Sequence, residues 1–173
     1  PDPTDDRSGA AAMLVRRLSA IADRAQQLFR EMDFGFLFDH TRKLFSIGYR
    51  VRDGSLDPSY YDLLASEARL TSFLAIAKGD VEPDHWFRLG RAMTPVGRGS
   101  ALISWSGSMF EYLMPDLVMR SPIRSLLDNT NRLVVARQIR YATELGVPWG
   151  ISESGFNARD LAQNYQYSGF GVP

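Results

Sequence analysis

The stretch SLLDNTNRLVVARQIRYATEL, residues 125–145, has the longest helical pattern in the second half of this sequence. Its apolar positions include Leu126, Leu127, Leu133, Val134, Ile139 and Tyr141. Gly146 follows directly, as glycine often does at the C-terminal end of a helix. We therefore predict one helix over residues 125–145.

Three further helices are predicted elsewhere in the sequence. Residues 9–32 carry apolar side chains three and four positions apart, which places them on one helix face, with Ser8 as the cap. Asp57 and Pro58 are residues typical of a helix start, and that helix is expected to run to Lys78 and stop at Gly79. A third covers residues 109–119, with an N-terminal cap within 106–108 and a kink or end at Pro115.

Short aromatic and β-branched segments lie between these helices. Residues 34–38 and 44–51 predict a β-hairpin joined by the polar residues 39–43. Residues 101–105 resemble a short strand, and Asn157 is expected to cap a last short helix ending at Leu161. Helices that alternate with aromatic loops are typical of a mainly α fold in which helical hairpins carry a site on their loops.

Composition excludes several classes of protein. The 173 residues contain 20 basic and 20 acidic side chains, so the formal charge is zero, and no basic surface for nucleic acid or anionic membrane is expected. Cysteine is absent and histidine occurs only at His40 and His85, so we expect no metal site. No cofactor is expected either. No apolar run reaches the roughly 18 residues of a membrane span, and we interpret both ends as truncation points.

Two carboxylates stand out among aromatic residues. Glu111 lies close to Trp105 and Tyr112, and a buried acid beside aromatic rings suits an acid catalyst or a ligand hydrogen bond. The more conservative interpretation is a first-turn acid stabilised by the helix dipole. Glu153 follows Trp149 in a polar loop. This pattern is equally consistent with a functional site and with a turn that caps the next helix.

Polar and aromatic residues after Glu153 extend this candidate site. Asn157, Arg159 and Asp160 are suited to hydrogen-bond sugar hydroxyls or to hold Glu153. Tyr165 and Tyr167 would share one side of a strand, where they either stack on a sugar or pack in a core.

Several longer motifs carry a resemblance to a known family. They are MDFGFLFD at 32–39, LDPSYYDLLASEAR at 56–69, HWFRLGR at 85–91, SWSGSMFEYLMP at 104–115, PWGISES at 148–154 and NARD at 157–160. Together they closely resemble the glycoamylase-like domain of cyclic β-1,2-glucan synthases, which are large bacterial membrane enzymes. The resemblance covers residues 32–173 and leaves residues 1–31 as a helical lead-in segment.

The resemblance implies a fold, a reaction and partners. The fold would be part of an (α/α)6 toroid of the six-hairpin glycosidase type, truncated at Pro173. The domain would close linear β-1,2-glucan into a ring by retaining transglycosylation. Glycosyltransferase and phosphorylase-like domains of the same polypeptide would be its partners, and nucleic acid would not. The full-length protein would lie in the inner membrane with this domain facing the cytoplasm.

The resemblance also suggests roles for residues. Glu153 would be the catalytic acid/base, and Trp105 and Glu111 would contact substrate subsites, with Tyr112 and Trp149 nearby. Retaining chemistry needs two carboxyl groups about 5 Å apart, and the nucleophile is expected beyond Pro173, which would leave the fragment inactive alone. The alternatives are an endo-β-1,2-glucanase-type hydrolase fragment and a non-catalytic glucan-binding helical module.

Overall fold

The computed structural model describes residues 3–168 and 171–172, and the side chains of 3–7, 154–157 and 168 are outside the described part. The chain divides into two compact units, Pro1–Phe36 and Leu37–Pro173. Each unit is described by itself below.

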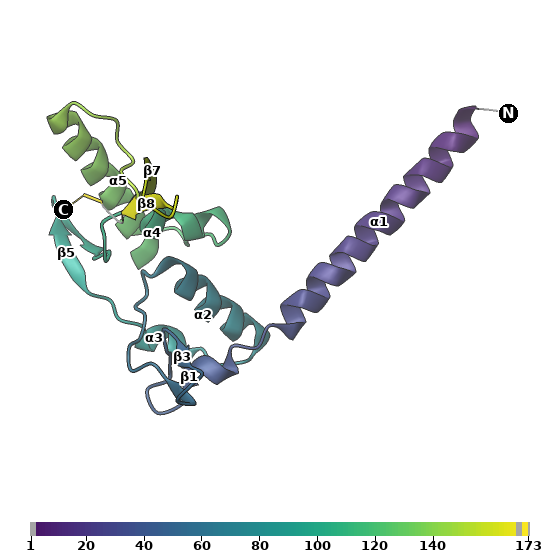
Figure 1. The fold of residues 1–173 in the computed structure, drawn as a ribbon, viewed down its shortest axis with the longest axis horizontal. Helices are drawn as coiled ribbons and strands as arrows, with labels where there is room; N and C mark the ends of the chain where they lie inside the picture. The colour runs from purple at the N-terminus through teal and green to yellow at the C-terminus, as the bar shows by residue number, and fades with distance from the viewer. Residues whose placement is uncertain (1–2, 169–170, 173) are drawn as a thin grey trace. The chain divides into compact units, whose positions relative to one another are not determined.

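The first unit is built on a single long helix, α1, which spans Pro3–Glu31 (Figure 1). This confirms the helix predicted over residues 9–32. Because α1 begins before Ser8, the expectation that Ser8 caps it is wrong. Its apolar stripe faces solvent, with Leu14 and Leu18 each 56% exposed.

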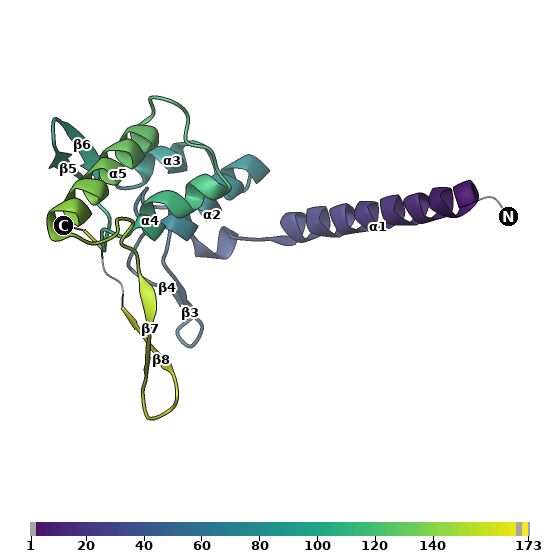
Figure 2. The ribbon, with the colours of Figure 1, turned by 90° about the horizontal axis from the view of Figure 1, so that it is seen from above.

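The second unit combines helices with four two-stranded antiparallel sheets (Figures 1 and 2). Its helical elements are η1 (Gly35–Leu37, which begins in the first unit), α2 (Ser66–Lys78), α3 (Asp84–Arg88), α4 (Met109–Leu113), η2 (Met114–Leu117) and α5 (Leu126–Leu145). Its strands are β1 (Phe38–Asp39), β2 (Leu44–Phe45), β3 (Tyr49–Arg50), β4 (Ser55–Leu56), β5 (Met93–Val96), β6 (Gly99–Leu102), β7 (Ser154–Arg159) and β8 (Tyr165–Ser168). Strands pair in sequence order, β1 with β2 and so on to β7 with β8.

The expected (α/α)6 toroid is wrong for this chain. A toroid is built from repeated antiparallel pairs of long helices, and in the second unit only α2 and α5 are longer than five residues within the described part. The rest of its regular structure consists mainly of four small two-stranded sheets and short helical turns. The observed architecture is an irregular α+β unit with two substantial helices.

Local capping signals predicted helix ends well. Ser108 caps α4, where its hydroxyl accepts a hydrogen bond from the Glu111 amide at 3.3 Å. Helix α4 ends at Leu113 and gives way to η2, which has Pro115 in its first turn, and α5 is capped by Gly146, which has a φ of 67°. Gly79 ends α2 with a φ of 82°, a conformation that glycine adopts without strain.

The predicted start of α2 at Asp57 is wrong, because backbone pairing with an earlier segment takes precedence. The Asp57 amide donates to the Gly48 carbonyl at 2.9 Å, and the Ser59 carbonyl accepts from the Ile47 amide at 3.0 Å. Asp62 instead turns the chain toward α2, because its carboxylate accepts from the amides of Leu64 and Ala65. The helix therefore begins at Ser66.

Two further predictions change in the structure, one of a hairpin and one of a helix. The first hairpin is confirmed but short, with Phe38 opposite Phe45, and the rest of 44–51 turns away into β3. The last short helix, predicted from Asn157, is wrong, because residues 154–159 form β7 against β8. Figure 2 shows this last hairpin projecting from the helices of the second unit.

The core of the second unit is formed by the segment just before α2, the residue after α3, and β6, α4 and α5. Its buried members are Leu63, Leu64, Leu89, Ala101, Leu102, Met109, Tyr112, Leu127 and Val134. Leu102 at the end of β6 also ties the hairpin to α5, because its amide donates to the Thr130 hydroxyl at 3.2 Å. The β5–β6 hairpin is thereby fixed against the longest helix of the unit.

A second buried cluster surrounds His85, which is fully buried. Its Nδ1–H donates to the Lys43 carbonyl and its Nε2 accepts from the Ser72 hydroxyl, both at 2.9 Å. The rings of Phe38 and Phe45 contact it edge to face. Burial lowers the pKa of His85 below its usual range, against smaller opposing effects of the Lys43 carbonyl and Asp84. The imidazole is therefore neutral in the folded protein, and its role is structural.

We expect the second unit to lose stability as the pH falls below about 6.5, the ordinary pKa of histidine. Below that value the unfolded chain takes up a proton on His85 before the folded one does, so acid favours unfolding, with a slope of at most about 1.4 kcal/mol per pH unit. Urea unfolding at pH 7.5 and 5.5 measures this loss, and His85→Gln should show a smaller one. An equal pH dependence in both proteins would contradict the assignment.

Candidate functional site

The loop that carries Glu153 is docked onto the N-terminus of α4. The Met109 amide donates to the Ile151 carbonyl at 3.0 Å, and the Phe110 amide donates to the Ser152 hydroxyl at 3.0 Å. The first amides of a helix have no partner within the helix itself. The docked loop supplies these partners, so the start of α4 fixes where Glu153 lies.

Gln138 on α5 fixes the same loop from the other side. It is 2% exposed, and its Oε1 accepts from the Ile151 amide at 2.9 Å. Its Nε2 donates to the carbonyls of Gly107 and Ile151, at 3.2 and 3.4 Å. A single buried amide therefore joins α5 to the residue before the α4 cap and to the loop of Glu153.

Glu153 is held by two hydroxyl groups. Ser108 Oγ donates to Glu153 Oε1 at 3.1 Å, and the Tyr167 hydroxyl donates to Oε2. This hydrogen bond to Glu153 is the largest cause that raises the pKa of Tyr167, so its phenol stays a donor. The sequence predicted that Tyr167 would stack on a sugar or pack in a core, and its hydroxyl instead holds the Glu153 carboxylate.

Glu153 opens onto a hollow of about 330 Å³, which we call the glutamate hollow. It is lined by Tyr61, Ala65, Ser66, Glu67, Trp105, Ser106, Phe110, Glu111 and Glu153. Three carboxylates from α2, α4 and the docked loop therefore meet in one hollow.

Glu67 is the residue of this hollow that the sequence reasoning missed. It lies in the first turn of α2, is exposed, and accepts a hydrogen bond from the Ser66 hydroxyl at 2.5 Å. Sequence alone offered one signal: the pair Ser-Glu occurs at 66–67 and again at 152–153. Of these four residues, Ser66, Glu67 and Glu153 line the hollow.

Trp105 supplies a flat apolar surface beside these carboxylates. Its side chain is 64% exposed, and it stacks on Tyr61 with ring centroids 5.5 Å apart and planes inclined by 20°. Its indole Nε1 donates to Asp62 Oδ2 at 3.0 Å. The ring is therefore held in place although most of it faces solvent.

Glu111 forms the inner wall of the glutamate hollow, and Tyr112 lies next to it in the chain, outside the lining. Glu111 is 8% exposed and accepts hydrogen bonds from the Ser104 hydroxyl and from the Trp105 amide, the latter at 3.1 Å. Tyr112 is 6% exposed, and its hydroxyl donates to the Leu102 carbonyl at 2.9 Å. Both side chains are occupied in shaping the 104–106 turn that presents Trp105.

A buried cation lies behind this wall. Arg69 is fully buried, its Nη2 donates to the Tyr112 carbonyl at 3.5 Å, and its Nε and Nη1 have no hydrogen-bond partner in the described part of the chain. Burial lowers the pKa of Arg69, while the charges of Asp116, Glu111 and Asp62 act in the opposite direction. Its charge is thus balanced by carboxylates that it does not contact directly.

The remaining predicted site residues lie apart from the lining of the glutamate hollow. Trp149 is 53% exposed in the loop after α5. Arg159 packs on the Tyr165 ring, with its guanidinium carbon 4.4 Å from the ring centroid, and donates to the Tyr165 hydroxyl. Asp160 accepts from the amides of Ala162 and Asn164, so it shapes the turn between β7 and β8. The side chain of Asn157 is outside the described residues.

Within the described residues, no group of three or more His, Cys, Asp or Glu side chains is arranged to hold a metal ion. No helix in that part of the chain is both long enough and apolar enough to cross a membrane.

Comparison with known proteins gives one informative similarity. No family model matches the chain. The chain is 56% identical over 165 residues to the cyclic beta-(1,2)-glucan synthase NdvB of Rhizobium meliloti (strain 1021). The match covers 95% of this chain and 6% of that protein. The predicted similarity to cyclic β-1,2-glucan synthases is therefore confirmed, in that the chain is homologous to a segment of such a synthase, while its assignment to the glycoamylase-like domain stays a prediction.

Replacing Gln138 tests whether its amide holds the Glu153 loop. Gln138→Leu removes all three hydrogen bonds, and we expect the second unit to lose about 1–3 kcal/mol of unfolding free energy. Urea unfolding followed by tryptophan fluorescence measures this, because Trp86, Trp105 and Trp149 all lie in that unit. Gln166→Leu is the matched control, because the Gln166 side chain on β8 is exposed. This variant should change the free energy of unfolding little. Equal stability of the two variants would contradict the role of Gln138.

Proposed function

We propose that this chain, as a homologue of a segment of a cyclic β-1,2-glucan synthase, closes linear β-1,2-glucan into rings by retaining transglycosylation. The observation that carries the proposal is the meeting of Glu67 and Glu153 in one hollow beside the exposed ring of Trp105. The homology supports a role in cyclic glucan synthesis, and the glutamate hollow offers the groups that such a reaction needs.

Retaining chemistry uses two carboxyl groups with different duties. One attacks the anomeric carbon and forms a covalent glycosyl ester, while the other protonates the oxygen of the bond that breaks. The second group then removes a proton from the incoming hydroxyl, which displaces the ester. When that hydroxyl belongs to the far end of the same glucan, a ring forms, and when water replaces it, the glucan is hydrolysed.

Hydrogen bonding suggests which glutamate has which duty. An ionised carboxylate only accepts hydrogen bonds, and both oxygens of Glu153 accept from hydroxyl groups. Two hydroxyl donors hold this carboxylate in one orientation, which suits a nucleophile. Glu67 is exposed and accepts one hydrogen bond, from its neighbour Ser66 to its Oε2, which leaves its Oε1 available to the oxygen of the bond that breaks. We therefore propose Glu153 as nucleophile and Glu67 as acid/base, in place of the acid/base role expected for Glu153 and of a nucleophile beyond Pro173.

Trp105 provides the means to hold a sugar beside this pair. An aromatic ring offers a large apolar face, and that of Trp105 is fixed by Tyr61 and Asp62 before any ligand arrives. The apolar face of a glucose ring would lie on it, with its hydroxyls directed to the carboxylates. A chain with zero formal charge also suits a neutral glucan. Other domains of a longer polypeptide would supply the linear chain.

A segment replacement tests the catalytic pair. In the Rhizobium meliloti synthase, this chain would replace the matching 165 residues, and cyclic β-1,2-glucan would be measured from UDP-glucose. We expect Glu153→Gln and Glu67→Gln each to lower ring formation at least about 100-fold, the usual scale for losing a catalytic acid or base, with linear glucan accumulating.

The matched control is Glu144→Gln at the exposed end of α5, which should leave ring formation unchanged. Unchanged ring formation by the Glu153→Gln protein would refute the catalytic assignment. Shorter linear chains in place of rings, made by the unsubstituted segment, would favour the hydrolase alternative.

A further inference from the structure

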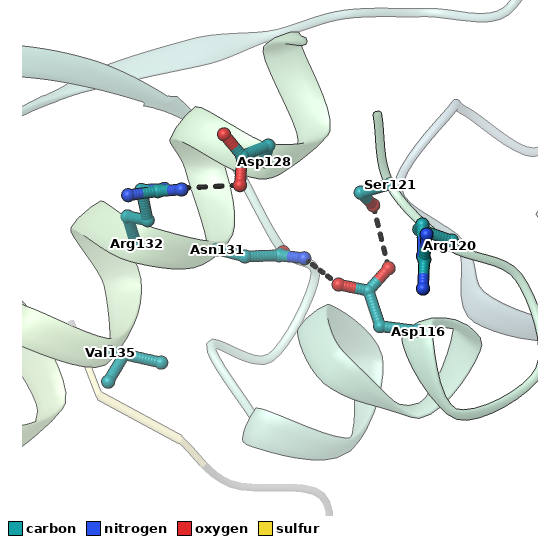
Figure 3. A pocket seen from close by; sticks show the side chains of 7 residues that line it. All are labelled: Asp116, Arg120, Ser121, Asp128, Asn131, Arg132 and Val135. Atoms are coloured by element: carbon teal, nitrogen blue, oxygen red, sulfur yellow. Dashed lines mark hydrogen bonds and ion pairs between the residues drawn. The ribbon is translucent and has the colours of Figure 1, made fainter. Parts of the chain in front are cut away.

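A second polar hollow, which we call the Asp116 hollow, is lined by other residues than the glutamate hollow. It measures about 540 Å³ and is lined by Asp116, Arg120, Ser121, Asp128, Asn131, Arg132 and Val135 (Figure 3). None of these residues lines the glutamate hollow. Its size lies within the roughly 300–1,000 Å³ of small-molecule sites, but its lining is polar where such sites are usually apolar.

The polar groups of the Asp116 hollow are held in place by one another. Asp116 accepts from the Ser121 hydroxyl at 2.6 Å and from the Asn131 amide, and Arg132 Nε donates to Asp128 at 3.1 Å (Figure 3). Asn131 itself is only 8% exposed. A ligand would therefore meet groups whose orientation is already fixed, which lowers the entropy lost on binding.

Hydrogen-bonding capacity remains after these internal bonds are formed. Within the described part of the chain, the Arg120 guanidinium makes no hydrogen bond or ion pair, and Arg132 uses only its Nε. Asn131 Oδ1 is buried and has no partner there. This oxygen has almost no accessible surface, so the groups that the hollow offers to a ligand are the free guanidinium N–H groups of Arg120 and Arg132.

The charge balance of the Asp116 hollow selects the class of ligand. Two carboxylates, Asp116 and Asp128, stand against two guanidinium groups, Arg120 and Arg132, so the formal charge of the lining is zero. The two carboxylates would repel an anion, and the two guanidinium groups would repel a cation. A neutral hydroxyl group donates one hydrogen bond and accepts two, so it satisfies both kinds of partner at once.

From these observations we infer that the Asp116 hollow binds the hydroxyl groups of a glucose unit in β-1,2-glucan, as a non-catalytic site separate from Glu153. The inference rests on the proposed function for the choice of sugar. With Val135 as its apolar member and no aromatic ring in its lining, the hollow contacts hydroxyl edges, in contrast to the ring face offered by Trp105.

Amide NMR of the 173-residue chain, titrated with a linear β-1,2-linked glucose pentasaccharide, tests the inference. We expect saturable shifts near Ser121 and Arg132, and separate shifts near Ser106 and Phe110. Arg120→Ala should weaken the first set at least tenfold and leave the second unchanged. Arg120 is exposed and makes no hydrogen bond or ion pair within the described residues, so this variant should fold. Arg140→Ala is the matched control, because Arg140 is an exposed arginine on α5.

The outcomes separate this inference from the proposed function. Shifts near Phe110 alone would overturn the second site and leave the catalytic hollow supported. Shifts near Ser121 alone would support the second site and count against the catalytic hollow. No shift in either place would overturn both. Stronger shifts near Ser121 with inorganic phosphate than with the sugar would also overturn the inference, because they would identify an anion site.

Discussion

The site depends on how the first amides of α4 find their partners. A helix start that is buried without partners is costly, and here the Ser108 hydroxyl and the loop at 151–152 provide them. Gln138 binds the same loop from α5. Because Glu153 follows directly, its position is set by the need to satisfy backbone amides. The carboxylate is therefore fixed by the fold before any substrate is present.

Helix ends could be predicted from sequence where the signal is local. Ser108 and Gly146 act through atoms within four residues of themselves, so the sequence pattern contains the whole cause. Asp57 carries the same kind of signal, but its amide is taken by Gly48, which no local pattern indicates. Likewise, residues 154–159 become β7 because β8 pairs with them. The prediction of a toroid is wrong because it concerned the arrangement of whole helices, which similar motifs do not determine by themselves.

The sequence predicted only those parts of the candidate site that have a local signal. Glu153 stood out because it lies in a polar loop near a tryptophan. Glu67 looks like an ordinary first-turn acid on α2, a position that the helix dipole favours, and only the folding of α2 against α4 brings it to the glutamate hollow. Tyr167 and Ser108, which hold Glu153, are 59 residues apart and meet only in the folded chain.

The buried cation explains how two polar hollows exist so close to one small core. Glu111 forms the wall of the glutamate hollow and Asp116 the floor of the other, and they lie five residues apart on the continuous α4–η2 segment. Two carboxylates on one short segment repel each other, and Arg69 behind them attracts both. A buried guanidinium with unpaired nitrogens is costly by itself. Asp116, Glu111 and Asp62 oppose this cost through their charges, so Arg69 links the electrostatics of the two hollows.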